Sequence, residues 1–395
     1  MTTPVVPAPR LAGFYFGYFA LMGAFMPYWN LYLEHLGFEK AIIGVLASIT
    51  VITRIVAPSI WGYLADRSGQ RMRWVRIGTL AQLIAWCAVL LLPNTLFWLA
   101  VILFAFSFFQ NAILAQFEAV TLFWLGDARD RYGIIRLWGS VGFIAAVFGL
   151  GWWFELTSIA LLPLMMVGLA ALTWCISMLI AEPPAQPVSR KQSSSLWQVL
   201  ARPNVRWFFI VQFLLLLSHA PFYSFYSNYL QAYGYSTQTI GLLWSVGVLA
   251  EVLMFTQSHR LMAWGSERFL LFACLALTAL RWWLVGYFPE HLSVQIAAQA
   301  IHAFSFALFQ SLAMRLIFRE FHADQQGRAQ ALYSMVWGIG VALGSFLAGW
   351  YWEQFGGSVM FYVAAGLSLL AALLMGLSVW NTPQSKGSQT ATDLT

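Results

Sequence analysis

Long apolar runs recur along the whole 395-residue chain and constrain its fold more than any other feature. Each run has about 20 residues, the length that an α-helix needs to cross a hydrocarbon core of about 30 Å. Only 9% of the residues are charged, against roughly 25% in an average soluble domain. We therefore expect an all-α membrane protein with twelve transmembrane helices. The predicted spans are 11–35, 41–63, 74–92, 97–124, 135–155, 159–181, 205–231, 239–262, 269–288, 292–318, 329–353 and 358–380.

The basic residues predict how the chain is oriented. If the N-terminus is cytoplasmic, the outer loops carry a single basic residue, Lys40, whereas the inner side carries twelve. Because cytoplasmic loops are enriched in Lys and Arg, we expect both termini in the cytoplasm. The expected location is a bacterial inner membrane. Basic loops facing anionic lipid explain the net charge of +6, so no nucleic-acid partner is expected. The inner basic residues are Arg67, Arg71, Arg73, Arg76, Arg129, Arg131, Arg190, Lys191, Arg202, Arg260, Arg268 and Arg328.

The chain also contains an internal repeat. Gly44 and Gly241 are 197 positions apart, and so are the mid-span charges Arg54 and Glu251. Farther along, GWWFE at 151–155 recurs as GWYWE at 349–353, at an offset of 198. Two halves with the same topology predict a parallel-repeat transporter, in which substrate binds near the midplane and the halves rock about it.

A polar strip at 182–204, rich in Pro and Ser, separates the two halves. It follows an even number of predicted spans, so we expect a cytoplasmic linker. The predicted domains are a six-helix bundle over 1–181 and a pseudo-symmetric six-helix bundle over 205–380. The tail at 381–395, rich in Ser, Thr, Gln and Gly, is expected to be disordered and cytoplasmic.

The loop after the second predicted span, GYLADRSGQR at 62–71, carries a known motif. It resembles the major facilitator signature G-x-x-x-D-R/K-x-G-R/K, with Gln70 inserted. The resemblance implies that Asp66 caps a neighbouring helix and that the motif latches the bundles together on the cytoplasmic side. The alternative is a solvated turn that places basic residues inside. The predicted latch residues are Gly62, Asp66, Arg67, Gly69 and Arg71.

Ionisable residues within the predicted spans are the candidates for function. Such groups are costly at bilayer depth, so they pair with one another or line a water-filled path. The alternative for each is a structural ion pair or, for the histidine, a hydrogen-bonded core residue. The six candidates are Arg54, Glu118, Arg136, Glu251, Arg281 and His302.

The residues around Arg136 carry a second resemblance. YGIIRLWGSVGF at 132–143 is similar to the fifth-helix motif of lactose permease and its oligosaccharide:proton symporter relatives. In those proteins an acid 18 positions before the Arg contacts substrate with it, and Glu118 stands 18 before Arg136. The first predicted span, YFALMGAFMP at 18–27, also resembles theirs.

A closer resemblance, spanning nearly the whole chain, is to the 3-phenylpropionate permease branch of the same superfamily. It rests on RLWGSV at 136–141, His219-Ala220, GLLWS at 241–245, AEV at 250–252, Arg281-Trp282 and His302.

One position departs from the lactose permease group. There, a second acid one turn after the helix-ten His is central to proton release, whereas this chain has Ser305. The resemblance therefore leaves Glu251, with Arg281 and His302, as the proton-coupling residues. Burial favours the protonated form of a carboxyl and a nearby guanidinium favours the ionised form, so movement of Arg281 would switch the proton on or off.

Charge and aromatic content predict an anionic substrate. Three Arg and one His face two acids in the candidate set, and a guanidinium suits a carboxylate. Aromatic side chains at similar depths offer stacking for a ring, although most Trp residues in membrane proteins pack or form interfacial belts. The predicted substrate-binding residues are Arg54, Glu118, Arg136, Trp138, His219, Tyr223 and Trp244.

We therefore expect a secondary active transporter that couples uptake of a small organic acid, such as 3-phenylpropionate, to protons. A proton-coupled sugar or nucleoside symporter is the alternative, with Glu118 and Arg136 on hydroxyls and Trp138 on the apolar face of a sugar. A drug exporter is disfavoured because such pumps more often keep their acids in the first half. No HExxH, GxSxG or phosphate-loop motif occurs, so no enzyme, cofactor or metal is expected. The expected partners are substrate, protons and lipid, with the protein as a monomer.

Overall fold

The computed structural model describes residues 6–184, 195–322 and 325–377, and all regular structure in these segments is helical. This confirms the predicted all-α class. The first half contains α1 (Ala8–His35), α2 (Lys40–Ser68), α3 (Arg71–Leu91), α4 (Leu96–Leu125), η1 (Arg129–Arg131), α5 (Tyr132–Leu156), η2 (Ile159–Leu161) and α6 (Leu162–Met178). The rest contains α7 (Trp197–Leu200), α8 (Pro203–Ala232), α9 (Thr237–Trp264), α10 (Glu267–Tyr287), α11 (Leu292–Ala303), η3 (Phe304–Leu308), α12 (Phe309–Glu320) and α13 (Gln326–Leu377).

Ten helices of the described part are long and apolar enough to cross a membrane, which confirms a multi-pass membrane protein. The number differs from the predicted twelve for two reasons. The 52-residue α13 is broken at Gly356, whose φ of 79° and ψ of 161° are not helical. The 28-residue α1, which contains Tyr, Trp and Asn side chains, is long enough but is not among the ten.

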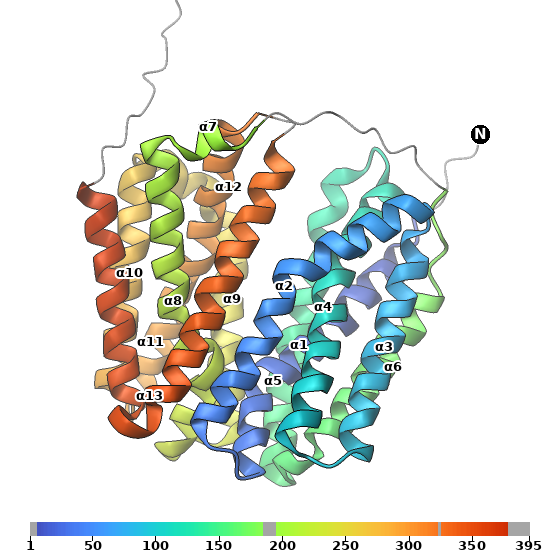
Figure 1. The fold of residues 1–395 in the computed structure, drawn as a ribbon, viewed down its shortest axis with the longest axis horizontal. Helices are drawn as coiled ribbons and strands as arrows, with labels where there is room; N and C mark the ends of the chain where they lie inside the picture. The colour runs from blue at the N-terminus through green and yellow to red at the C-terminus, as the bar shows by residue number, and fades with distance from the viewer. Residues whose placement is uncertain (1–5, 185–194, 323–324, 378–395) are drawn as a thin grey trace, which may run out of the picture.

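The helices gather in two groups, α1–α6 and α8–α13, whose ribbons diverge toward the end that carries the N-terminus and α7 (Figure 1). At the opposite end the groups are joined by hydrogen bonds. Asn30 Nδ2 donates to the Ser224 carbonyl at 2.6 Å, and Ser48 Oγ donates to the Ala342 carbonyl at 2.9 Å. Every hydrogen bond between the groups in the described part lies toward the predicted outer loops. The structure therefore represents a state that is closed on that side.

Glycines of the repeat allow this close approach. A Cβ added at Gly44 would lie 2.7 Å from the Ser345 carbonyl oxygen and 3.0 Å from the Cα of Gly349. At the equivalent crossing, a Cβ at Gly241 would lie 2.7 Å from the Val147 carbonyl oxygen. Backbones this close leave no room for a side chain, so α2 packs on α13, and α5 on α9, through glycine. The repeat thus places equivalent glycines at two equivalent crossings.

The start of the predicted linker is hydrogen-bonded to the first group of helices. Both carboxylate oxygens of Glu182 accept hydrogen bonds, each of 2.9 Å, from the backbone N–H groups of Met72 and Arg73. These N–H groups belong to the first turn of α3, and the N-terminus of a helix favours a negative charge. Residues 185–194 of the linker, and the tail predicted over 381–395, lie outside the described residues.

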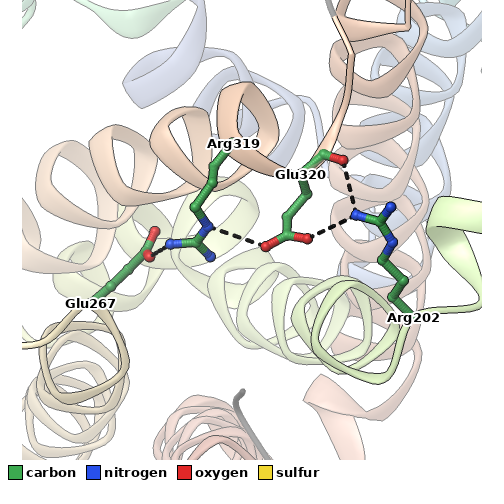
Figure 2. Close-up of polar contacts among 4 residues, drawn as sticks. All are labelled: Arg202, Glu267, Arg319 and Glu320. Carbon is green, nitrogen blue, oxygen red and sulfur yellow. Dashed lines mark hydrogen bonds and ion pairs between the residues drawn. The ribbon is translucent and has the colours of Figure 1, made fainter. Parts of the chain in front are cut away.

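A cluster of four charges joins the inner ends of α8, α10 and α12 (Figure 2). Arg319 pairs with Glu267 and, at 3.1 Å, with Glu320, which also pairs with Arg202 at 3.3 Å. The side chains of Glu267 and Glu320 are each only 8% exposed. Arg319 therefore stabilises two carboxylates that have little access to water.

We expect Arg319→Ala to lower the free energy of unfolding by on the order of 2 kcal/mol, since it removes charged hydrogen bonds from enclosed acids. A thermal-unfolding measurement on purified protein in detergent checks this as a fall in apparent Tm. Arg315→Ala is the matched control, because Arg315 lies on the same helix and is exposed. Equal melting temperatures for the two variants would contradict a stabilising role for the cluster.

Candidate functional site

Three of the predicted mid-span residues form a hydrogen-bonded chain in the second group. Glu251 Oε1 lies 2.7 Å from His302 Nε2, and His302 Nδ1 lies 2.8 Å from Arg281 Nη1. Arg281 is fully buried, and the side chains of His302 and Glu251 are 6% and 17% exposed. The structure thus brings together the residues that the sequence predicts for proton coupling.

The partners of His302 define where its proton lies. A guanidinium only donates, so the Nδ1 atom that faces Arg281 must accept. The neutral ring then carries its proton on Nε2 and donates it to the Glu251 carboxylate. A second proton on the ring would remove the acceptor that Arg281 uses. Glu251 is therefore the group of this chain that can bind a proton while the bond between Arg281 and His302 remains.

Apolar and aromatic side chains surround this hydrogen-bonded chain. The guanidinium carbon of Arg281 lies 4.1 Å from the centroid of the Trp282 ring and 4.4 Å from that of Phe222. Its Nη2 donates to Gln299 Oε1 at 3.4 Å. Such surroundings strengthen electrostatic interactions, so a proton on Glu251 changes the forces on Arg281 strongly.

Ser305 lies directly beside this chain. Its Oγ donates to the His302 carbonyl at 3.0 Å and lies 3.4 Å from His302 Nδ1. It belongs to η3, a π-helical turn within the helix that runs from α11 to α12. Turns of this kind are frequent at functional sites. A hydroxyl cannot act as a second carboxylate here, so Glu251 is the acid of the hydrogen-bonded chain.

A second charged pair lies in the first group. Arg136 Nε is 3.8 Å from Glu118 Oε1, with side chains 30% and 37% exposed. The guanidinium lies 4.1 Å from the Phe19 ring centroid and 5.4 Å from that of Tyr15. Gly139, where a Cβ would lie 2.8 Å from Phe19, allows α5 to approach α1. The structure therefore confirms that Glu118 and Arg136 are neighbours. Sequence reasoning missed the two rings, which are four positions apart on one face of α1.

Arg54 lies at the middle of α2 and has a different kind of partner. Its guanidinium carbon is 4.1 Å from the centroid of the Trp337 ring, which belongs to α13 in the other group. No carboxylate of the described residues forms an ion pair with it. Sequence reasoning missed Trp337, because nothing in the chain indicates which α13 residue faces Arg54.

His219 and Tyr223 lie one turn apart on α8, near the charged chain. The His219 ring centroid is 6.1 Å from that of His302 and 5.9 Å from that of Tyr223. Its Nδ1 is 2.8 Å from the Leu215 carbonyl oxygen, while its buried Nε2 has no hydrogen-bond partner in the structure. The Tyr223 ring in turn lies 5.9 Å from Trp337. Both predicted residues therefore border the region between Arg54 and Arg281.

The two predicted tryptophans lie elsewhere. Trp138 is 49% exposed, and it is about 200° around α5 from Arg136, since successive residues turn by about 100°. Trp244 is buried, stacks on Phe222 at 4.8 Å and donates to Ser227 Oγ at 3.0 Å. Trp244 thus packs α9 against α8, and the structure does not bring either ring to the charged residues.

The predicted latch residues form contacts within the first group. Arg71 donates to Asp66 at 2.6 Å and to Gln116 of α4 at 2.7 Å. Gly69 ends α2 with a φ of 65°, a conformation that suits glycine. Arg67 donates to the Tyr63 hydroxyl at 3.0 Å, and a Cβ added at Gly62 would lie 3.9 Å from Gln116 Nε2. In this state the described contacts of the motif fix the turn from α2 to α3, and its contact with the second group stays a prediction.

Comparison with known proteins identifies the family. The family described as "MFS_1 like family" matches residues 9–363. The chain belongs to this family. It is a transporter of the major facilitator superfamily, as the loop motif and the repeat predict.

Curated relatives cover nearly the whole chain. It is 32% identical over 374 residues to the "Probable 3-phenylpropionic acid transporter" of Escherichia coli (strain K12), covering 91% of this chain and 95% of that protein. It is 26% identical over 352 residues to the "Maltose permease" of Geobacillus stearothermophilus, covering 88% of this chain and 86% of that protein. The resemblance to the 3-phenylpropionate permease branch is confirmed.

Solved structures confirm the fold. The nucleoside transporter NupG, as its D323A mutant, superposes with a TM-score of 0.85 over 93% of this chain and 98% of its own, at 18% identity. The peptide transporter PepTSo of the POT family has a TM-score of 0.75 over 94% and 97% of the two chains, at 11% identity. At these identities the likeness concerns the fold alone.

Proposed function

We propose that this transporter imports small aromatic carboxylates, such as 3-phenylpropionate, together with protons. The observation that carries the proposal is the chain of Glu251, His302 and Arg281 at mid-membrane depth. Ionisable groups at such depth are costly and mark substrate or proton paths. The printed name of the Escherichia coli relative supports the class of substrate.

The proposal includes the architecture that alternating access requires. Counting α13 as two helices at Gly356 and adding α1 to the ten apolar spans gives the twelve helices of two six-helix bundles. The linker at 182–204 then joins bundles over 1–181 and 205–380. Both termini are cytoplasmic, the membrane is the bacterial inner membrane, and the protein acts as a monomer.

Coupling follows from the bonds of the second bundle. Ionised Glu251 holds the His302 Nε2 proton in a charge-assisted hydrogen bond, which is about twice as strong as a neutral one. A proton on Glu251 removes that charge and weakens the bond. Arg281 then lacks a nearby counter-charge, and its positive charge stabilises an anion bound elsewhere in the site through space. Proton and anion therefore bind together more favourably than either one alone, which is positive coupling.

The two end states differ in which end is closed. In the present state the glycine crossings at Gly44 and Gly241 close the predicted outer side. The reverse state requires contacts at the inner side, where the latch of Gly62, Asp66, Arg67, Gly69 and Arg71 lies. Rocking between these states carries the substrate across.

Uptake into liposomes tests the proposal. Purified protein is reconstituted, a proton gradient is imposed, and accumulation of labelled 3-phenylpropionate is measured against a labelled disaccharide and a labelled nucleoside. We expect the aromatic acid to accumulate above its external concentration and the gradient-free control to reach parity. Accumulation of the sugar or nucleoside without the acid would reject the proposal.

A proton-coupled sugar or nucleoside symporter is the second candidate. The pair of Glu118 and Arg136, with partly exposed side chains, suits hydroxyl groups as well as a carboxylate. The relative named maltose permease adds support for a sugar. Arg54, which no described acid pairs, argues against it because a neutral ligand would not compensate that charge.

We expect Arg136→Lys to weaken substrate affinity by about tenfold, since one charged hydrogen bond is worth about 1.5–3 kcal/mol. Lysine keeps the charge but not the planar guanidinium, which lies over Phe19 and has its Nε 3.8 Å from Glu118 Oε1. Isothermal titration of the purified variant measures the change. Unchanged affinity would assign Arg136 to a structural ion pair.

A further inference from the structure

We propose that Arg54 is the carboxylate anchor of the substrate site and that Trp337 positions it, so the site selects a ligand by its single negative charge. The inference rests on the proposed transport of organic acids and deepens it. It also names Trp337, which lies in the opposite bundle from Arg54.

The charges of the ionisable residues singled out within the spans cancel except at Arg54. Arg136 has the Glu118 carboxylate at 3.8 Å. Arg281 reaches the Glu251 carboxylate through His302, with bonds of 2.8 and 2.7 Å. Arg54 has no such carboxylate among the described residues, either directly or through a bridging side chain. A guanidinium remains protonated, so one positive charge is left, and a monoanion compensates it.

Arg54 is also accessible. Arg281 is fully buried, with its Nη1 on His302, so a ligand cannot reach it in this state. Arg54 is half-buried, and no described group accepts a hydrogen bond from it. Trp337 covers the face of its guanidinium at 4.1 Å. The N–H groups of a guanidinium lie in its plane, so a ring on the face leaves the edges free for a two-pronged bond to a carboxylate.

The surroundings of Arg54 lead toward the proton-coupling residues. The Trp337 ring lies 5.9 Å from the Tyr223 ring, which lies 5.9 Å from the His219 ring. The His219 ring in turn lies 6.1 Å from that of His302. A carboxylate on Arg54 therefore lies within electrostatic range of the proton-coupling chain. Its aromatic tail has the rings of Trp337 and Tyr223, which are 5.9 Å apart, to pack against.

The position also connects the ligand to the moving parts. Arg54 and Trp337 lie beside the approach of Ile55 to Gly338, where a Cβ would be 3.3 Å from Ile55. A bound anion thus changes the charge balance next to a close contact of these two helices.

The test compares 3-phenylpropionate with its neutral amide on the purified, intact protein by isothermal titration. We expect the wild type to prefer the acid by about 10–100-fold, the value of a charged hydrogen bond. In Arg54→Gln the acid should bind no better than the amide, and continued binding of the amide shows that the variant is folded. Trp337→Phe should keep the preference, and Trp337→Ala should reduce it.

The matched control is the double variant Glu118→Gln/Arg136→Gln, which removes one charge of each sign. It should bind both ligands more weakly and keep the preference for the acid. If Arg54→Gln keeps the preference and the double variant loses it, the anchor is Arg136 and the inference is overturned, while transport of acids stands. If the wild type binds no aromatic acid, the proposed function itself fails. Should Arg54→Gln bind neither ligand, Arg54→Lys decides: a reduced preference supports the inference and an unreduced one overturns it.

Discussion

Glu251→Gln is expected to abolish accumulation of substrate against its gradient, while exchange between equal pools of substrate continues. Glutamine keeps the shape of the side chain and an oxygen that accepts the bond from His302 Nε2, now 2.7 Å from Glu251 Oε1. It cannot bind and release a proton. The carrier should therefore still reorient with substrate bound, but the proton gradient no longer drives it. Liposome uptake with and without a proton gradient, and counterflow without one, measure the two activities.

Glu290→Gln is the control, because Glu290 is an exposed acid at an outer loop. It should accumulate substrate like the wild type. If Glu251→Gln also accumulates substrate normally, the proton role passes to Glu118, the other mid-span carboxylate. Loss of both exchange and uptake would indicate instead that Glu251 holds the helices together.

Gly44→Val is expected to open the outer side of the transporter and to reduce transport strongly. The added Cβ would lie 2.7 Å from the Ser345 carbonyl oxygen and 3.0 Å from the Gly349 Cα, and these backbone atoms cannot move aside alone. Overpacking of this kind costs about 1–3 kcal/mol. This cost applies only to the state that is closed on the outer side, so it shifts the equilibrium toward the state that is open there by roughly 5–150-fold. The outer ends of α2 and α13 should therefore separate.

Distances between spin labels at Glu39 and Glu353, both exposed at the outer ends of these helices, measure the separation. The labelled background needs its native cysteines replaced, namely Cys87, Cys175 and Cys274. Gly366→Val is the control, since Gly366 also lies in α13 and a Cβ there meets nothing within 4 Å. A distance distribution for Gly44→Val that matches this control would show that the crossing does not define the closed state.

The sequence predicted most of the charged site because a charge in an apolar span has few alternatives. Glu251, Arg281 and His302 were singled out by depth, and they do form one chain. Glu118 and Arg136 were singled out because their 18-residue spacing resembles that of lactose permease, and α4 and α5 do bring them together. Burial of an unpaired charge is unfavourable, so most charged residues within the spans have a partner, and Arg54 is the exception.

The aromatic assignments were less accurate, since an aromatic residue is stable in the core, in lipid or beside a ligand. Trp244 has its N–H satisfied by Ser227, and Trp138 lies on the exposed face of α5. In contrast, the sequence did not single out Trp337 and Phe19, whose rings lie against the guanidiniums of Arg54 and Arg136. An apolar helix surface gives no sign of which ring faces a cation on another helix.

The sequence by itself determined that this chain is a membrane transporter of two repeated halves, with ionisable residues at mid-depth. Apolar length, the bias of basic loops and the 197-residue repeat are properties of the chain alone. Only the tertiary structure decided which charges are paired and which is left over. That depends on the rotation of each helix and on close crossings such as Gly44 with Gly349. Since helix rotation is fixed by packing between distant segments, the unpaired state of Arg54 became visible only in the folded protein.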